Sequence, residues 1–143
     1  MKKESEAVGG GKVHKIMKMD KKYIENLNVV ERSIIVDAQT EAPFSGEYND
    51  FFKSGVYVCK ACSTQLFLSD TKFDANCGWP SFDDAIEGTI LKRRDPSLGR
   101  IRTEILCANC EGHLGHVFEG ENYTEKNARY CVNSLSLKFI SKL

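Results

Sequence analysis

A single cysteine, Cys131, lies in the middle of a short strand-like run, Arg129-Tyr130-Cys131-Val132-Asn133. Side chains alternate along a strand, so Arg129, Cys131 and Asn133 are predicted to share one face. A guanidinium group favours the reactive thiolate of a neighbouring cysteine, and an asparagine amide can hold a polar substrate atom. The run therefore predicts a nucleophilic thiol, and a cysteine buried only for packing is the alternative.

Four further cysteines form two Cys-x-x-Cys pairs, Cys59 with Cys62 and Cys107 with Cys110, each at the end of a predicted strand. Two such pairs are the ligand set of a tetrahedral structural zinc site. All four positions of that zinc are closed, so we expect it to join two distant hairpins and to couple folding to metal binding. Two local disulfides or redox dithiols are the alternative, but the βαβ pattern of thioredoxin-like redox motifs is absent.

The sixth cysteine, Cys77, lies in a loop fixed by Gly78 and Pro80, next to the only tryptophan of the chain, Trp79. Trp79 and Phe82 could form the wall of a pocket for an apolar or methyl-bearing ligand. Sulfur–aromatic contacts would suit a thioether or a sulfoxide. The alternative is that both rings simply belong to the core.

Two of the three histidines, His113 and His116, lie in the glycine-containing segment 112–118. Histidine can protonate an oxygen near neutral pH, and an imidazolium lowers the pKa of a nearby cysteine. A second metal site or one satisfied buried histidine is the alternative. The glycines make this segment a poor helix, and we interpret it as one loop that carries both histidines. The third histidine, His14, is predicted to be solvated.

The predicted elements that hold these residues are mostly short strands. Residues 1–19 lack a sustained period and are predicted to form a flexible tail, followed by a single domain over 20–143. Asp20 can cap a short helix, whereas 29–37 can end a helix or form a buried strand. The predicted strands are 56–58, 66–68, 89–93, 100–106, 117–118 and parts of 129–140, with a hairpin loop at 95–99. The fold class is therefore mostly β and antiparallel, with a small helical arm at the N-terminus.

Composition excludes several classes of protein. The 143 residues suggest one domain, and 20 basic against 20 acidic residues make sequence-independent nucleic-acid binding a poor expectation. No apolar run is long enough for a transmembrane helix, and no apolar stretch follows the N-terminal lysines as in a secretory signal. We therefore expect a cytoplasmic protein, in which paired cysteines favour a metal site over a disulfide framework.

Together the motifs resemble those of the B-type methionine sulfoxide reductases. The resemblance covers most of the chain, from residue 43 to residue 139, and several motifs in one order are more specific than any motif alone. The motifs are 43–48, the pair Cys59 and Cys62, 77–82, the pair Cys107 and Cys110, 113–118 and 129–133.

The resemblance implies an oxidoreductase that reduces the R epimer of methionine S-oxide in peptides and proteins. Its family fold is a pair of small antiparallel sheets, tent-like, with an N-terminal helical arm. Cys131 matches the nucleophile, which becomes a sulfenic acid, and His116 with His113 nearby matches the group that protonates the oxygen. Cys77 matches the resolving cysteine, which forms a disulfide with Cys131 that thioredoxin then reduces.

The resemblance also assigns the substrate and metal residues. Trp79 matches the residue that packs on the substrate methyl group, and Arg129 and Asn133 match polar groups near the nucleophile. Phe118 and Phe82 complete the expected substrate-binding set. The four paired cysteines match the zinc-binding subtype. The expected partners are oxidised methionine in proteins and thioredoxin, with no nucleic acid and no membrane, and the chain is expected to be a monomer.

The sequence departs from the family pattern at two places. Residues 119–124 replace a Pro-Asp-Gly-Pro turn that many family members carry, and the tail before Asp20 has no counterpart in the family pattern.

Two rival functions are the alternatives. One rival is a non-catalytic zinc-ribbon interaction module, in which Cys77 and Cys131 are inert core residues. The other is a zinc hydrolase or deaminase, which needs an open metal position and a carboxylate base. Four thiolate ligands, and no His-x-Glu before the cysteine pairs, disfavour it.

Overall fold

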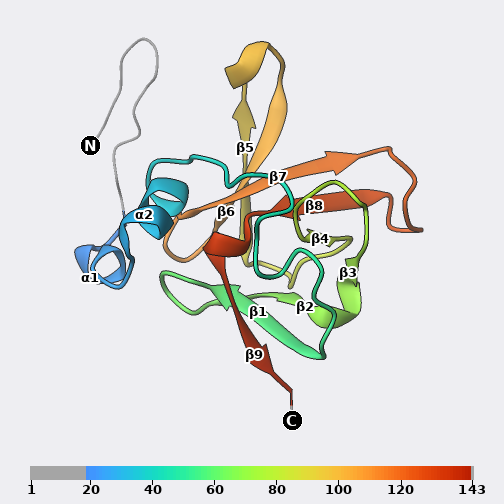
Figure 1. Ribbon diagram of the computed structural model, residues 1–143. Coiled ribbons are helices and arrows are strands. Elements are labelled where there is room, and N and C mark those ends of the chain that lie inside the picture. Colours follow the sequence, from blue (N-terminus) through green and yellow to red (C-terminus); the bar gives the residue numbers. More distant parts are fainter. Residues whose placement is uncertain (1–18, 143) are drawn as a thin grey trace.

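The computed structural model describes residues 19–142, so His14 and the predicted tail, except residue 19, lie outside the described part of the chain. Residues 19–142 contain two short α-helices and nine β-strands in two antiparallel sheets (Figure 1). The elements are α1 (Lys21–Ile24), α2 (Val29–Ile35), β1 (Gly55–Cys59), β2 (Gln65–Leu68), β3 (Lys72–Phe73), β4 (Ser81–Phe82), β5 (Ile90–Asp95), β6 (Arg102–Cys107), β7 (His113–Glu119), β8 (Ala128–Val132) and β9 (Leu137–Ser141). None of the helices within residues 19–142 has the length and apolar character that a membrane crossing needs.

Both helices of the N-terminal arm begin at a capping side chain. The Asp20 carboxylate accepts a hydrogen bond from the Lys22 backbone N–H at 3.0 Å, as its predicted capping role requires. Asn28 and Glu31 form a reciprocal capping box at the start of α2, with hydrogen bonds of 2.8 and 3.0 Å. The ambiguous segment 29–37 is therefore helical over most of its length, and its two isoleucines are buried.

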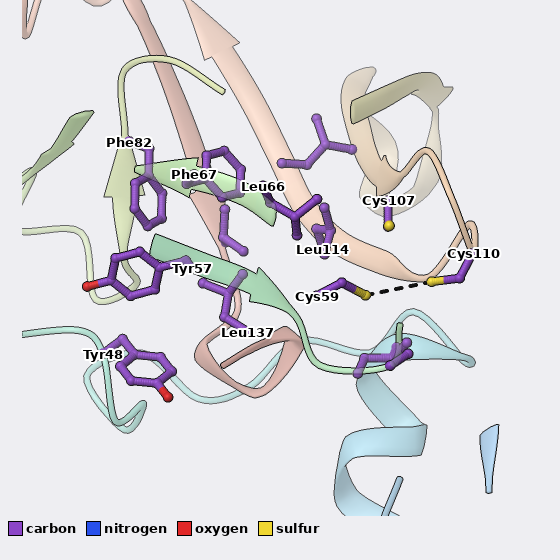
Figure 2. Packing of buried hydrophobic residues seen from close by; sticks show 14 of the residues in the cluster. Tyr48, Tyr57, Cys59, Leu66, Phe67, Phe82, Cys107, Cys110, Leu114 and Leu137 are labelled. Atoms are coloured by element: carbon purple, nitrogen blue, oxygen red, sulfur yellow. Dashed lines mark hydrogen bonds between the residues drawn. The ribbon is translucent and has the colours of Figure 1, made fainter. Parts of the chain in front are cut away.

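The two sheets confirm the predicted mostly β, antiparallel architecture. The smaller sheet has the strand order β2-β1-β9, and the larger has the order β3-β4-β8-β7-β6-β5. Aromatic rings join them in the core (Figure 2). Phe82 on β4 stacks on Phe67 of β2 with ring centroids 4.3 Å apart and meets Tyr57 of β1 at 5.1 Å. All three are fully buried, and each such side chain contributes about 1.5–3 kcal/mol of hydrophobic stabilisation.

The histidine segment differs from its prediction as a loop, because β7 already begins at His113. Ile105 on β6 pairs with Gly115 but the next residue pairs with His113, so β7 contains a bulge at Leu114. Residues three apart on a regular strand point to opposite faces. The extra residue of the bulge brings both histidines to one side, with ring centroids 5.8 Å apart.

Candidate functional site

The centre of the site is a pair of cysteine thiols on the larger sheet. Cys131 on β8 is paired with Ser81 on β4 and with His116 on β7. Directly opposed residues of antiparallel strands share a face, so these three side chains form one row. Cys77, in the loop between β3 and β4, is hydrogen-bonded to Cys131 and lies 3.4 Å from the Ser81 hydroxyl. The fold thus brings the two unpaired cysteines of the sequence close enough to influence each other's protonation.

Arg129 lies beside this thiol pair, two residues before Cys131 on the same strand. Its Nη1 donates to the Cys77 sulfur at 3.4 Å. Two hydrogen bonds of 2.8 and 3.1 Å to the Glu121 carboxylate fix the guanidinium, which also covers the Phe118 ring at 4.6 Å. Glu121 belongs to residues 119–124, the segment that differs from the turn of many family members. This segment therefore supplies the carboxylate that holds Arg129 in place.

The two thiols, Cys77 and Cys131, differ in acidity. The pKa of Cys77 is lowered to about 5, mainly because Cys131 donates a hydrogen bond to it, with further help from Ser81 and Arg129. The same hydrogen bond, together with burial, raises the pKa of Cys131. At neutral pH the pair therefore holds one thiolate and one shared proton, next to a fixed positive charge.

Each histidine of β7 is held by a carboxylate. His116 Nε2 lies 2.7 Å from Asp95 Oδ2, and His113 Nδ1 lies 2.7 Å from Glu104 Oε2. Burial lowers the pKa of His116, and the hydrogen bond to Asp95 opposes that shift. The Nε2 atom of His113 is buried without a hydrogen-bond partner in the described structure, and such a group invites a polar ligand atom.

Glu41, in the loop after the helical arm, connects the residues that line the other side of the site. Its carbonyl accepts from Trp79 Nε1 at 3.1 Å, and its backbone N–H donates to Asn133 Oδ1 at 3.0 Å. Its carboxylate accepts from the backbone N–H groups of Ser134 and Leu135 at 2.9 and 3.0 Å. Burial raises the pKa of Glu41 against these hydrogen bonds. The loop therefore positions the site, a role that sequence reasoning missed.

Asn133 follows β8 and does not simply extend the alternating face of the predicted strand. Its Oδ1 accepts from Glu41, and its Nδ2 donates to the Leu114 carbonyl at 3.0 Å. The amide thus joins the N-terminal segment to the bulge of β7. A direct contact between Asn133 and substrate stays a prediction.

Phe82 is a correction to the predicted substrate-binding set. It is paired with Tyr130, one residue before Cys131, so its side chain lies on the opposite face of the sheet. That face meets the smaller sheet, where Phe82 is 0% exposed. Phe118, by contrast, is half-buried and lies under Arg129. The pocket candidates among the aromatic residues are therefore Trp79 and Phe118.

The four paired cysteines form a second site, which can hold a metal ion. Their sulfur atoms all lie within 4.8 Å of one another. Cys62 lies 3.6 Å from Cys107, and Cys59 lies 3.6 Å from Cys110 (Figure 2). A tetrahedral zinc ion with Zn–S bonds of about 2.3 Å separates its sulfur ligands by about 3.8 Å, so this donor set fits that ion. Local disulfides within each pair do not explain contacts between the pairs.

The two halves of the metal site have the same backbone geometry. Cys59 ends β1 and Cys107 ends β6, and each carbonyl accepts a hydrogen bond at 2.8 Å from the residue after the second cysteine. Those residues, Ser63 and Glu111, have φ angles of 67° and 65°, which closes a tight turn. Crowding raises the pKa of Cys59, mainly through its hydrogen bond with Cys107. A cation would remove this competition for protons.

Known proteins with similar sequences match most of the chain. Residues 27–141 match the family model described as the SelR domain. A protein of Bradyrhizobium diazoefficiens named peptide methionine sulfoxide reductase MsrB is 46% identical over 130 residues, which cover 90% of this chain and 92% of that protein. A protein of the same name from Agrobacterium fabrum is 45% identical over 87% of this chain and 93% of its own length. Peptide methionine sulfoxide reductase B5 of Oryza sativa is 54% identical over 70% of this chain and 73% of its own length.

Proposed function

Because the chain belongs to the SelR family and is a methionine sulfoxide reductase of the B type, we propose that it reduces the R epimer of methionine S-oxide in peptides and proteins, with Cys131 as the nucleophile. One observation supports this assignment above all others. The Cys131 thiol lies near the Cys77 thiol and Arg129, on a sheet face that also presents His116. A cysteine buried only for packing would not need a second thiol, an arginine and a histidine beside it.

The first step transfers the sulfoxide oxygen to Cys131. The Cys131 sulfur attacks the sulfoxide sulfur while its proton passes along the shared hydrogen bond to the Cys77 thiolate. His116, with His113 beside it, protonates the departing oxygen as a general acid. The oxygen then passes to the Cys131 sulfur as the transient sulfur–sulfur bond breaks and methionine leaves. The products are methionine, a sulfenic acid on Cys131, a neutral Cys77 thiol and a neutral His116. Methionine sulfoxide is reduced by two electrons, and Cys131 is oxidised by two.

The second step resolves the sulfenic acid. The Cys77 sulfur attacks the Cys131 sulfur, and the hydroxyl takes up the Cys77 proton and leaves as water, so that a disulfide forms between two neighbouring residues. Exchange with the dithiol of thioredoxin then returns both cysteines to the reduced state. Trp79 packs on the substrate methyl group, oriented by its hydrogen bond to Glu41. A monomer in the cytoplasm is the expected form.

Zinc is the metal that we propose for the four-cysteine site. Four thiolate ligands suit zinc, which then serves as a structural ion and takes no part in the reaction. The same closed ligand set disfavours the zinc hydrolase rival. The non-catalytic zinc-ribbon rival is disfavoured because it gives no reason for Cys77 and Cys131, the two cysteines outside the metal site, to lie close together.

Separated epimers of a methionine sulfoxide peptide test this function. The reduced enzyme is mixed with each epimer in the absence of any reductant, and the methionine peptide released is measured. We expect about one equivalent from the R epimer and none from the S epimer. Release from neither epimer, by a folded protein with its metal bound, would instead support the zinc-ribbon module.

Replacing Cys77 tests its two roles, as the base in the first step and as the resolving thiol. Because the pKa of Cys77 is lowered to about 5, the wild-type first-turnover rate should fall as the pH drops through about 5. At higher pH the rate should fall again as His116, the general acid, loses its proton. In Cys77→Ser the rate should climb with pH toward an ordinary thiol pKa of about 8.5, and be up to about thirtyfold slower at about pH 7.

Cys77→Ser should still release about one equivalent of methionine peptide and then stop, even with thioredoxin present. Sustained thioredoxin-driven turnover by this variant would show that another group resolves the sulfenic acid. A first-turnover rate that keeps the wild-type pH profile would remove Cys77 from the first step.

A further inference from the structure

We propose that the β5–β6 hairpin binds acidic residues that flank the methionine sulfoxide in a substrate chain, an inference that rests on the function proposed above. Positive charge is concentrated in this hairpin, although the whole chain is neutral. The hairpin, residues 90–107, holds two acidic residues, Asp95 and Glu104, which both bind the histidines of β7. Against them stand five basic residues: Lys92, Arg93, Arg94, Arg100 and Arg102. All of these basic residues except Arg102 are exposed.

One of these arginines shares the row of the reactive thiol. Arg93 on β5 is opposite Glu104 on β6, which is opposite His116 on β7, which is opposite Cys131 on β8. Opposed residues share a face, so Arg93 projects from the same face of the sheet as the nucleophile. Arg94, its neighbour, is opposite Thr103 and belongs to the other face.

The distance across the sheet sets the spacing that a substrate would need. Neighbouring strands lie about 4.8 Å apart, so β5 is about 14 Å from β8. An extended peptide advances about 3.3 Å per residue. A carboxylate about four residues from the methionine sulfoxide would therefore reach Arg93 while the sulfoxide lies at Cys131.

The hairpin is also open to a partner chain. β5 is an edge strand of the larger sheet, and the far end of the hairpin extends beyond the rest of the fold (Figure 1). Leu98 and Ile101 at that end are 79% and 63% exposed. An extended segment lying along or across β5 would find backbone groups, apolar contacts and positive charge together. Charge complementarity therefore favours an acidic segment of the substrate protein as the occupant.

Charged residues on an edge strand can also serve only to prevent aggregation. In that case Arg93 and Arg94 would be equivalent, because both protect the same edge. Under our proposal they differ, because only Arg93 lies on the face of Cys131. Arg94→Glu is therefore a matched control for Arg93→Glu, with the same change of charge at an adjacent exposed position.

The experiment compares three substrates in single turnover without reductant, at low ionic strength. Two are peptides with an R sulfoxide and either aspartates or lysines about four residues away on both sides. The third is N-acetyl methionine R-sulfoxide amide, which is too small to reach the hairpin. For wild type we expect a second-order rate about tenfold higher for the acidic peptide than for the basic one, and a smaller ratio as salt is added.

Arg93→Glu should lose or invert the preference for the acidic peptide, whereas Arg94→Glu should keep it. Wild type and both variants should reduce the small substrate at the same rate, which shows that the catalytic site is intact. If Arg93→Glu disturbs the catalytic site, Arg93→Gln is used in its place. The inference would be overturned if both glutamate variants lost the preference for the acidic peptide equally. It would also be overturned if the wild type reduced both peptides at the same rate. Neither result would affect the proposed function. A defect seen only with thioredoxin present would overturn the inference as well, by assigning the hairpin to the reductant. Failure to reduce any of the substrates would instead overturn the proposed function.

Discussion

The variant Cys131→Ser is expected to fold, to keep its metal and to release no methionine from the R sulfoxide, a loss of at least about a thousandfold in rate. Serine differs from cysteine by one atom, so β8 should keep its pairing with β4 and β7. A hydroxyl is a far weaker acid and a poorer nucleophile toward sulfur than a thiol, so the oxygen has no acceptor. Release of methionine in single turnover measures the loss directly.

The two thiols make this experiment discriminating, because the more acidic one is not the proposed nucleophile. The pKa of Cys77 is lowered to about 5, whereas that of Cys131 is raised. Attack by the more readily ionised thiol would predict the opposite pattern, with Cys131→Ser active for one turnover and Cys77→Ser inactive. That result would transfer the role of nucleophile to Cys77. We expect Cys131 to attack because its strand places it in the row of His116, the proton donor for the oxygen.

Residue types and short spacings were enough to predict several parts of the structure. The two Cys-x-x-Cys pairs are local motifs that bind one tetrahedral ion wherever the fold brings them together, and the four sulfurs do converge. The alternation around Cys131 correctly indicated a strand, because a period of two is a backbone property. The segment 29–37 stayed ambiguous, although the capping box of Asn28 and Glu31 was readable in the sequence.

Other features depended on strand register, which local pattern does not specify. The bulge at Leu114 decides that His113 and His116 face the same side, and it arises from the pairing of β7 with β6. The carboxylates that hold the histidines, Asp95 and Glu104, come from two other strands of the sheet. The nearest sequence signal was weak: Asp95 opened a predicted hairpin loop, and Glu104 was a polar residue in a predicted strand.

Close approach of two strands explains one more choice of residue at the site. A Cβ atom at Gly115 would lie 1.9 Å from the Cys131 carbonyl oxygen, so β7 can approach β8 there only with glycine. Sequence reasoning took this glycine as a sign of a loop. In the structure it is a sign of tight strand packing beside the nucleophile, which positions His116 opposite Cys131.

Removal of the metal is expected to unfold the protein rather than to abolish catalysis selectively. The four-cysteine site joins the end of β1 in the smaller sheet to the end of β6 in the larger sheet, and Cys59, Cys107 and Cys110 are buried there. Zinc contributes about 10–16 kcal/mol to the folding of small thiolate-rich domains. A domain of this size is stable by only about 5–15 kcal/mol. The metal term is therefore as large as the whole stability.

A chelator titration measures this coupling, with circular dichroism, metal content and first-turnover activity followed on the same samples. The three signals should fall together, and Cys107→Ser should melt well below wild type even before chelation. Cys77→Ser is the matched control, because it removes one thiol outside the metal site and should melt with wild type. Loss of activity while the folded signal and the melting temperature stay unchanged would mean that the metal acts in catalysis. The closed set of four thiolates argues against that outcome, because it leaves the ion no position at which a substrate atom could bind.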